Sequence, residues 1–124
     1  MKKALILAAL LLSSAAQAEI YFCDGKAGAV LELDKTSESL VDADFLISTT
    51  AGFKRTGPNE DYRGECQVGS LDNVNGNAIR TITCTDFTPF AADLIMMDAI
   101  NLVFTRSLSF PGSSYTWTGQ CSEL

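Results

Sequence analysis

Short hydrophobic and β-branched runs recur along the chain, and in one of them polar and apolar positions alternate with the period of a half-buried β-strand. In residues 28–34, Leu31 and Leu33 fall on one face, and Val30 and Glu32 fall on the other. Segments rich in Gly, Pro, Asn and Asp, which favour turns, separate these runs, and Asp24-Gly25 is expected to be such a turn. The pattern indicates strands at residues 19–23, 28–34, 40–50 (one or two strands), 63–71, 77–85, 100–107 and 113–121. The sequence therefore predicts an all-β fold, a small antiparallel β-barrel or sandwich of about eight short strands.

Residues 88–100 fit two kinds of element. Pro89 suits the first turn of a short helix, and Phe90, Leu94 and Met97 follow at helical spacing. A strand over residues 93–98 is favoured, because that segment matches residues 30–34 when the two halves of the chain are aligned.

That alignment also concerns the four cysteines and suggests two pseudo-repeated halves. Cys23 is followed by an apolar run that ends in Asp and, later, by Cys66 in a Gly-x-Cys triplet. Cys84 is followed by a similar run and by Cys121 in a second Gly-x-Cys triplet. The repeat predicts two disulfides, Cys23–Cys66 and Cys84–Cys121, one in each half.

A hairpin signal supports a different pairing. Asn75 and Gly76 both tolerate positive φ, so they predict a two-residue hairpin turn. In that hairpin Cys84 lies opposite Gln67 and beside Cys66, which allows a Cys66–Cys84 disulfide. Cys23 and Cys121 would then form the second disulfide. The repeat pairing is favoured, and the hairpin pairing and the crossed pairing stay open.

The beginning of the chain has the organisation of a secretory signal peptide. Lys2 and Lys3 precede an apolar run over residues 4–12, and residues 16–18 form an Ala-x-Ala cleavage site. The run is too short to cross the ~30 Å hydrocarbon core, so no membrane insertion is expected after cleavage. An even number of cysteines suits an oxidising compartment. We expect residues 1–18 to be a signal peptide and residues 19–124 to be a single disulfide-bonded β domain, secreted or periplasmic.

The net charge of the chain indicates which class of partner to expect. The chain has 9 basic residues, 15 acidic residues and no histidine, a net charge of −6. Loss of Lys2 and Lys3 with the leader leaves 7 basic against 15 acidic residues, a net charge of −8. This balance disfavours nucleic acid and anionic lipid as partners and favours a basic protein.

The absence of histidine excludes several kinds of chemistry. It excludes Ser-His-Asp and Cys-His nucleophilic catalysis and imidazole-ligated metals. Residues 72–77 resemble a calcium loop, but placing Gly76 at the sixth position puts Leu71 at the first, where a carboxylate is needed. We therefore expect no cofactor, no metal site and no enzymatic activity.

The longest polar stretch, residues 51–63, is the candidate binding segment. Within it Phe53 stands next to Lys54 and Arg55, and Tyr62 lies near its end. Binding residues concentrate on exposed loops that a rigid scaffold positions. We take these four residues as candidate binding residues.

Two short segments resemble a known family. Residues 21–25 (Tyr-Phe-Cys-Asp-Gly) are similar to the opening of the periplasmic C-type lysozyme inhibitors, which are small exported disulfide-bonded β-barrels. Residues 115–119 (Tyr-Thr-Trp-Thr-Gly) are similar to the closing segment of that family. The family's Ser-Gly-x-Arg-Tyr recognition motif has no match, and Thr118 stands where the family has lysine, so no inhibitory residue is carried over.

These observations favour a non-catalytic exported domain, a protein-binding or inhibitor-like module. The alternative is a barrel that holds a small apolar ligand among residues 94–97, Phe104 and Trp117.

Overall fold

The computed structural model describes residues 17–32, 41–72 and 75–124, so most of the predicted signal peptide lies outside the described residues. Within these ranges eight β-strands form one sheet, and every strand pair is antiparallel. The strands are β1 (Ile20–Glu32), β2 (Ala43–Ser48), β3 (Gly52–Arg55), β4 (Glu65–Asp72), β5 (Ala78–Phe87), β6 (Ala92–Asp98), β7 (Val103–Phe110) and β8 (Ser113–Glu123).

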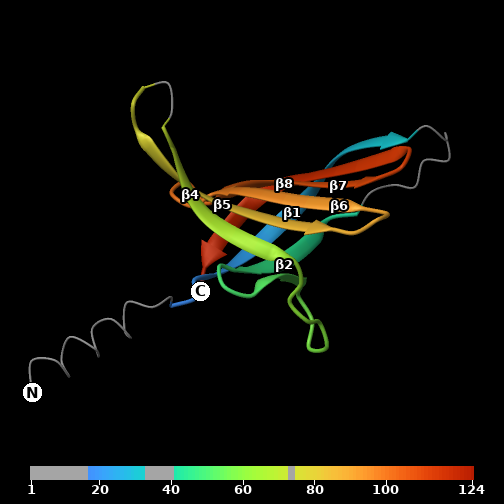
Figure 1. Cartoon of the computed structure of the whole chain (residues 1–124), viewed down its shortest axis with the longest axis horizontal. Coiled ribbons are helices and arrows are strands. Elements are labelled where there is room, and N and C mark those ends of the chain that lie inside the picture. Colours follow the sequence, from blue (N-terminus) through green and yellow to red (C-terminus); the bar gives the residue numbers. More distant parts are fainter. Residues whose placement is uncertain (1–16, 33–40, 73–74) are drawn as a thin grey trace, which may run out of the picture.

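The sheet curls into a nearly closed barrel (Figure 1). Its order is β3-β2-β1-β8-β7-β6-β5-β4, so β4 to β8 form a meander of hairpins and β1 adds to β8. The two edge strands approach each other through one bridge, in which the backbones of Phe53 and Arg63 exchange two hydrogen bonds of 2.9 Å. The predicted all-β antiparallel fold is confirmed, and of the two expected architectures, barrel or sandwich, the sheet has the barrel-like one.

The first strand is longer than the sequence pattern indicates. Asp24 and Gly25 were expected to form a turn, but both lie inside β1, whose only register shift against β8 falls between Ala27 and Val30. Gly25 pairs with Gly119 of β8. A Cβ on Gly25 would lie 2.3 Å from the carbonyl oxygen of Ala43. Gly25 is therefore required for the close approach of strands rather than for a turn.

The ambiguous segment forms a strand, β6, as favoured. Pro89 and Phe90 belong to the tight connection before it, where the Thr88 amide donates to the Ala91 carbonyl over 2.9 Å. In β6 the side chains alternate between inward and outward positions, as they do in a half-buried strand.

The favoured disulfide pairing is wrong, and the hairpin pairing is present. The bonds are Cys23–Cys121 and Cys66–Cys84. Each joins residues directly opposite each other on adjacent strands, β1 with β8 and β4 with β5. The hairpin itself differs from the prediction, because residues 73–77 separate β4 from β5 and this odd-length connection places Cys66 directly opposite Cys84.

The two halves of the chain do not fold alike. Cys23 and Val30 lie on the same strand, β1, whereas the residues aligned with them, Cys84 and Leu94, lie on β5 and β6. Both disulfides follow strand neighbours in one continuous sheet, so the similarity between the halves does not describe the fold.

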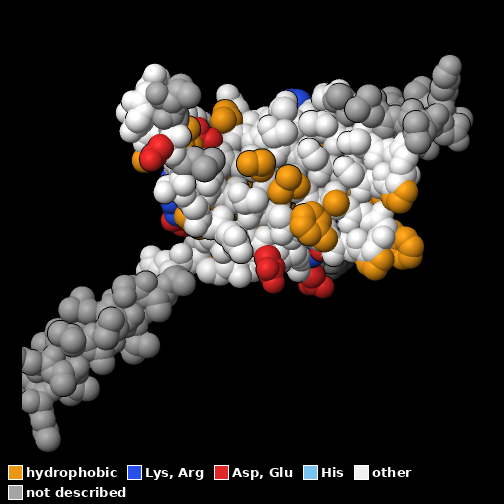
Figure 2. All heavy atoms as spheres, turned by 45° about the horizontal axis from the view of Figure 1, so that its top comes forward, with side chains coloured by type: hydrophobic (Ala, Val, Ile, Leu, Met, Phe, Trp, Pro, Cys, Tyr) orange, Lys and Arg blue, Asp and Glu red, His pale blue; other side chains and the backbone are white. Residues whose placement is uncertain are grey.

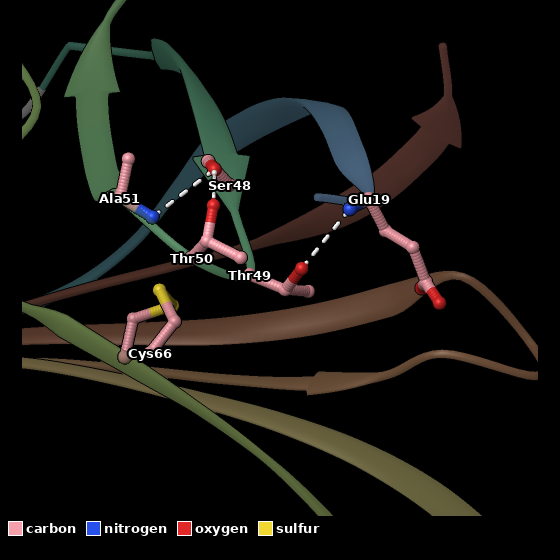
Figure 3. The surroundings of a disulfide bond; sticks show 7 residues. Glu19, Ser48, Thr49, Thr50, Ala51 and Cys66 are labelled. Atoms are coloured by element: carbon pink, nitrogen blue, oxygen red, sulfur yellow. Dashed lines mark hydrogen bonds between the residues drawn. A yellow bond between two sulfur atoms is a disulfide. The ribbon is translucent and has the colours of Figure 1, made fainter. Parts of the chain in front are cut away.

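The barrel interior is filled mainly by apolar side chains: Tyr21, Cys23, Phe45, Ile47, Phe53, Ile82, Cys84, Ile95, Met97, Phe104, Trp117 and Cys121. Figure 3 shows one end of it, where Cys66 lies near the turn between β2 and β3. In that turn the Ser48 hydroxyl accepts a hydrogen bond from the Ala51 amide, and the Glu19 amide donates to the Thr49 hydroxyl over 3.0 Å. Hydrogen bonds thus order the β2–β3 turn and join it to the residue before β1.

Candidate functional site

A buried ion network lies among the inward-facing side chains of the barrel. Asp93 of β6 is 1% exposed, and the Arg106 side chain of β7 is 9% exposed. Arg106 donates from Nε to Oδ1 of Asp93 over 3.0 Å and from Nη2 to Oδ2 over 2.7 Å. The two planar groups therefore form a bidentate pair, the strongest geometry for such an interaction.

A second arginine extends the network toward solvent. Arg63, between β3 and β4, donates from Nη2 to Oδ2 of Asp93 over 2.8 Å and from Nη1 to Oδ2 of Asp86 over 2.5 Å. Burial lowers the pKa of Arg63, but its hydrogen bonds to Asp86 and Asp93 and their charges outweigh this and raise that pKa. Two carboxylates thus neutralise two guanidinium groups that the fold takes partly or wholly out of water.

Aromatic rings enclose the buried guanidinium. The Arg106 guanidinium carbon lies 5.1 Å from the ring centroid of Phe45 and 5.5 Å from those of Phe53 and Trp117. The guanidinium carbon of Arg63 lies 4.7 Å from the ring centroid of Phe53. These distances allow cation–π attraction, and together with the carboxylate they hold both arginines in fixed positions.

A cleft of about 420 Å³ opens above this network. We call it the mouth cleft, because it lies at the end of the barrel where β2 begins and β3 ends. It is lined by Val41, Asp42, Ala43, Asp44, Arg55, Thr56, Arg63, Arg106, Leu108 and Trp117. The Trp117 indole N–H donates to the Val41 carbonyl over 3.0 Å, which fixes the ring in the wall of the cleft.

One side of the mouth cleft is acidic. Asp44 pairs across strands with Asp24, and desolvation together with the hydrogen bond and charge of Asp24 raises the Asp44 pKa. Asp42 accepts a hydrogen bond from the Ala27 amide over 2.7 Å, which lowers the Asp42 pKa. The exposed ammonium of Lys26 stands 3.5 Å from Asp24 and 3.6 Å from Asp42. The cleft therefore offers carboxylates on one wall and guanidinium groups on the other.

The structure brings two of the four candidate binding residues, Lys54 and Tyr62, into contact and does not gather all four at one place. Phe53 was expected on an exposed loop, but it lies in β3, is 1% exposed, and covers the two arginines from inside the barrel. Its pairing with Ile47 in β2 and with Arg63 explains this, because a strand at that position directs alternate side chains inward. Lys54 lies over the Tyr62 ring, 4.6 Å from its centroid. Arg55 alone lines the mouth cleft.

Sequence reasoning missed the centre of the site, Asp93 and Arg106. A signal for both existed in the strand period: Asp93 shares the inward register with Ile95 and Met97, and Arg106 shares it with Phe104 and Leu108. A charged residue in the apolar register of a strand predicts a buried ion pair, and two such residues on adjacent strands predict each other as partners.

A second, shallower hollow of about 580 Å³ lies over β6, β7 and β8. Met96 and Val103, both more than two-fifths exposed, lie in it beside threonines. Figure 2 shows hydrophobic side chains as separate groups on a surface that is otherwise mostly uncharged. The fixed charges of the mouth cleft make it the stronger candidate site.

The fold and site together define a small disulfide-bonded all-β barrel with a charged cleft at one end. No protein-family model matches the chain, and no curated protein or solved structure matches it either. Two disulfides in a small all-β domain are consistent with an extracellular or periplasmic location. Among residues 17–32, 41–72 and 75–124, no helix is long and apolar enough to cross a membrane. In the same ranges, no three His, Cys, Asp or Glu side chains form a group that could hold a metal ion.

Proposed function

We propose that this chain is an exported, non-catalytic protein-binding module that receives part of its partner in the mouth cleft. One observation carries the proposal: Arg106 and Arg63 both line the cleft, and a buried carboxylate and aromatic rings hold their guanidinium groups. Interface hot spots are enriched in arginine and tryptophan, and preorganised side chains lose little conformational entropy on binding.

The packing of the interior supports this proposal over the apolar-ligand alternative. Phe104 packs edge-to-face on Phe45 with ring centroids 4.9 Å apart, and Met97 is 1% exposed. Of the residues that would have lined an internal ligand cavity, Ile95, Met97 and Phe104 pack in the core, whereas Met96 is exposed. The opening at the barrel end is charged, which suits a polar protein surface better than an apolar small molecule.

A basic secreted protein is the partner class that the charge favours. The mature domain carries a net charge of −8, and the rim of the mouth cleft adds Asp42 and Asp44 locally. Opposite net charges raise the rate of encounter between two proteins. Basic secreted hydrolases, lysozymes and proteases included, are the partners to test first, with inhibition as the biological consequence.

The test is a binding and inhibition screen of residues 19–124 against basic secreted hydrolases. Trp117 is the single tryptophan of the chain, so its fluorescence reports occupation of the mouth cleft. Neighbouring residues of β3 provide a matched pair of variants, since Arg55 lines the cleft and Lys54 does not. We expect Arg55→Ala to weaken binding about tenfold and Lys54→Ala to change it less than about threefold.

Two results would contradict the proposal. One is the absence of any partner across a broad panel of basic and neutral secreted proteins. The other is a partner whose affinity is equally insensitive to Arg55→Ala and to Lys54→Ala.

A further inference from the structure

The edge of the barrel at β4 has unpaired backbone groups. β4 pairs with β5 on one side from Glu65 to Asp72. On its other side the edge contact to β3 is made before the strand begins, through the bridge of Phe53 with Arg63. Among the described residues, no backbone hydrogen bond reaches the outer edge of residues 66–70.

The disulfide shows which residues direct their amides and carbonyls to that edge. The Cα atoms of Cys66 and Cys84 lie 4.0 Å apart, the short spacing that marks a non-hydrogen-bonded pair in an antiparallel ladder. The backbone groups of Cys66 therefore point away from β5. By the alternation of the ladder, those of Val68 and Ser70 do so as well, while those of Gln67 and Gly69 bond to β5.

This part of β4 is also accessible and acidic. Residues 67–70 are all exposed, and the β4–β5 hairpin projects from the barrel (Figure 1). Glu65 and Asp72, at the two ends of β4, are exposed, and neither forms an ion pair with another described residue. The edge therefore combines a row of free donors and acceptors with two uncompensated negative charges.

We infer that the outer edge of β4 binds an extended segment of a basic partner protein, which adds to the sheet as a further strand. Strand addition uses main-chain hydrogen bonds for affinity and leaves side chains to set specificity. Lysines or arginines on the added strand would lie beside Glu65 and Asp72. A second copy of the chain is disfavoured as the occupant, because each mature domain carries a net charge of −8.

This inference does not depend on the mouth cleft. The cleft is lined from β2, β3, β7 and β8 and the segments beside them, and it includes no residue of β4. Partner binding in the mouth cleft and strand addition at β4 can therefore fail independently, and separate experiments detect each failure.

The test uses a synthetic octapeptide of alternating lysine and threonine as the probe, with alternating glutamate and threonine as its charge-reversed control. Threonine has a high strand propensity, so both peptides are able to extend. Binding to isotope-labelled domain 19–124 is followed by chemical shifts and hydrogen exchange. We expect the lysine peptide to protect the amides of Cys66, Val68 and Ser70 and the glutamate peptide to bind about tenfold more weakly or worse.

Val68 allows a selective block of the edge. Its amide makes no ladder bond to β5, so Val68→Pro removes an outward donor without breaking the hairpin, and proline is tolerated on edge strands. Val68→Thr keeps the amide and the branched side chain. We expect Val68→Pro to weaken the lysine peptide at least about tenfold and Val68→Thr to leave its affinity within about twofold. Arg55→Ala, in the mouth cleft, should leave the affinity of the peptide unchanged.

Any of four outcomes would overturn the inference. The first is that the lysine peptide does not bind the wild-type domain, and the second is that it binds Val68→Pro equally well. The third is that the chemical-shift changes centre on the mouth cleft instead of β4. The fourth is that sedimentation shows a dimer of the domain that Val68→Pro dissociates. Val68→Pro and Val68→Thr must show the same two disulfides and cooperative unfolding as the wild type. If Val68→Pro does not fold, the same question is answered by a probe N-methylated at alternate residues, which should bind at least about tenfold more weakly.

Discussion

The buried pair of Asp93 and Arg106 gives the sharpest test of how this barrel is held together. Asp93→Asn keeps the shape of the side chain but removes the charge that neutralises Arg106, whose side chain is 9% exposed. Removing one partner of a buried pair leaves an uncompensated charge in a medium of low dielectric constant, a loss of about 3–5 kcal/mol. The Asp93 carboxylate accepts three hydrogen bonds from two arginines, so we expect the upper part of that range.

The free energy of unfolding is measured by urea with the disulfides intact and Trp117 fluorescence as the probe. For a domain of this size the expected loss lowers Tm by at least about 12 °C. Replacing both charges, Asp93→Leu with Arg106→Met, should recover much of the loss, because the double variant leaves no unpaired charge between them. Added salt should change the difference between wild type and Asp93→Asn little, since buried pairs are weakly screened.

The reasoning is refuted if Asp93→Asn stays within about 1 kcal/mol of the wild type. It is also refuted if the double variant loses the full sum of its two single losses, because contact partners in one network are expected to be non-additive.

Three further outcomes follow from the fold. Alanine at both Cys23 and Cys121 should lower the free energy of unfolding by about 4–5 kcal/mol, since that bond closes the longer loop, and urea unfolding checks this. Gly119→Ala would place a Cβ 1.8 Å from a backbone oxygen of β1 and should lower the free energy of unfolding by about 2 kcal/mol or more. The control Gly57→Ala should change it by less than about 0.5 kcal/mol in the same assay, because the added Cβ would meet only a flexible side-chain carbon at 3.4 Å. Burial, and then a hydrogen bond to a carboxylate, raise the pKa of Tyr21 to about 12, so ultraviolet titration should show one tyrosine ionising well above the usual 10. The stability that Tyr21 contributes should be complete below pH 10 and lost as the pH rises through 12.

The strand period was enough to predict the fold class, because alternation is a local property. The alternation at residues 28–34 shows this, since β1 extends through Glu32. Residues 93–98 form β6 with Ile95 and Met97 inward, but there the strand was favoured through the alignment of the two halves, which does not describe the fold. The same local pattern could not show that Asp24 and Gly25 continue a strand and do not form a turn. Whether a glycine bends the chain or lets two strands approach depends on what lies across from it, here Ala43 and Gly119 on other strands.

The disulfide pairing was mispredicted for a related reason. The internal similarity paired cysteines that lie several tens of residues apart in the sequence. The hairpin around Gly76 instead brings Cys66 and Cys84 together at a sequence separation of 18. The remaining two cysteines then meet because β8 returns to β1, a closure that no local pattern contains. Local hairpin chemistry was the better guide, although its register was wrong by one residue.

The candidate site was missed where the sequence departed from the strand pattern. Asp93 and Arg106 occupy inward positions of the kind that apolar residues usually fill, and buried pairs of this kind are often no more stable than apolar replacements. Positions that break a local rule without a gain in stability are the ones at which function is expected. The same logic applies to β4, since an accessible edge invites association and this one is guarded only by Glu65 and Asp72. A barrel selected for stability alone would replace the buried pair by apolar side chains and cover the edge of β4, so both features support a role in contact with other proteins.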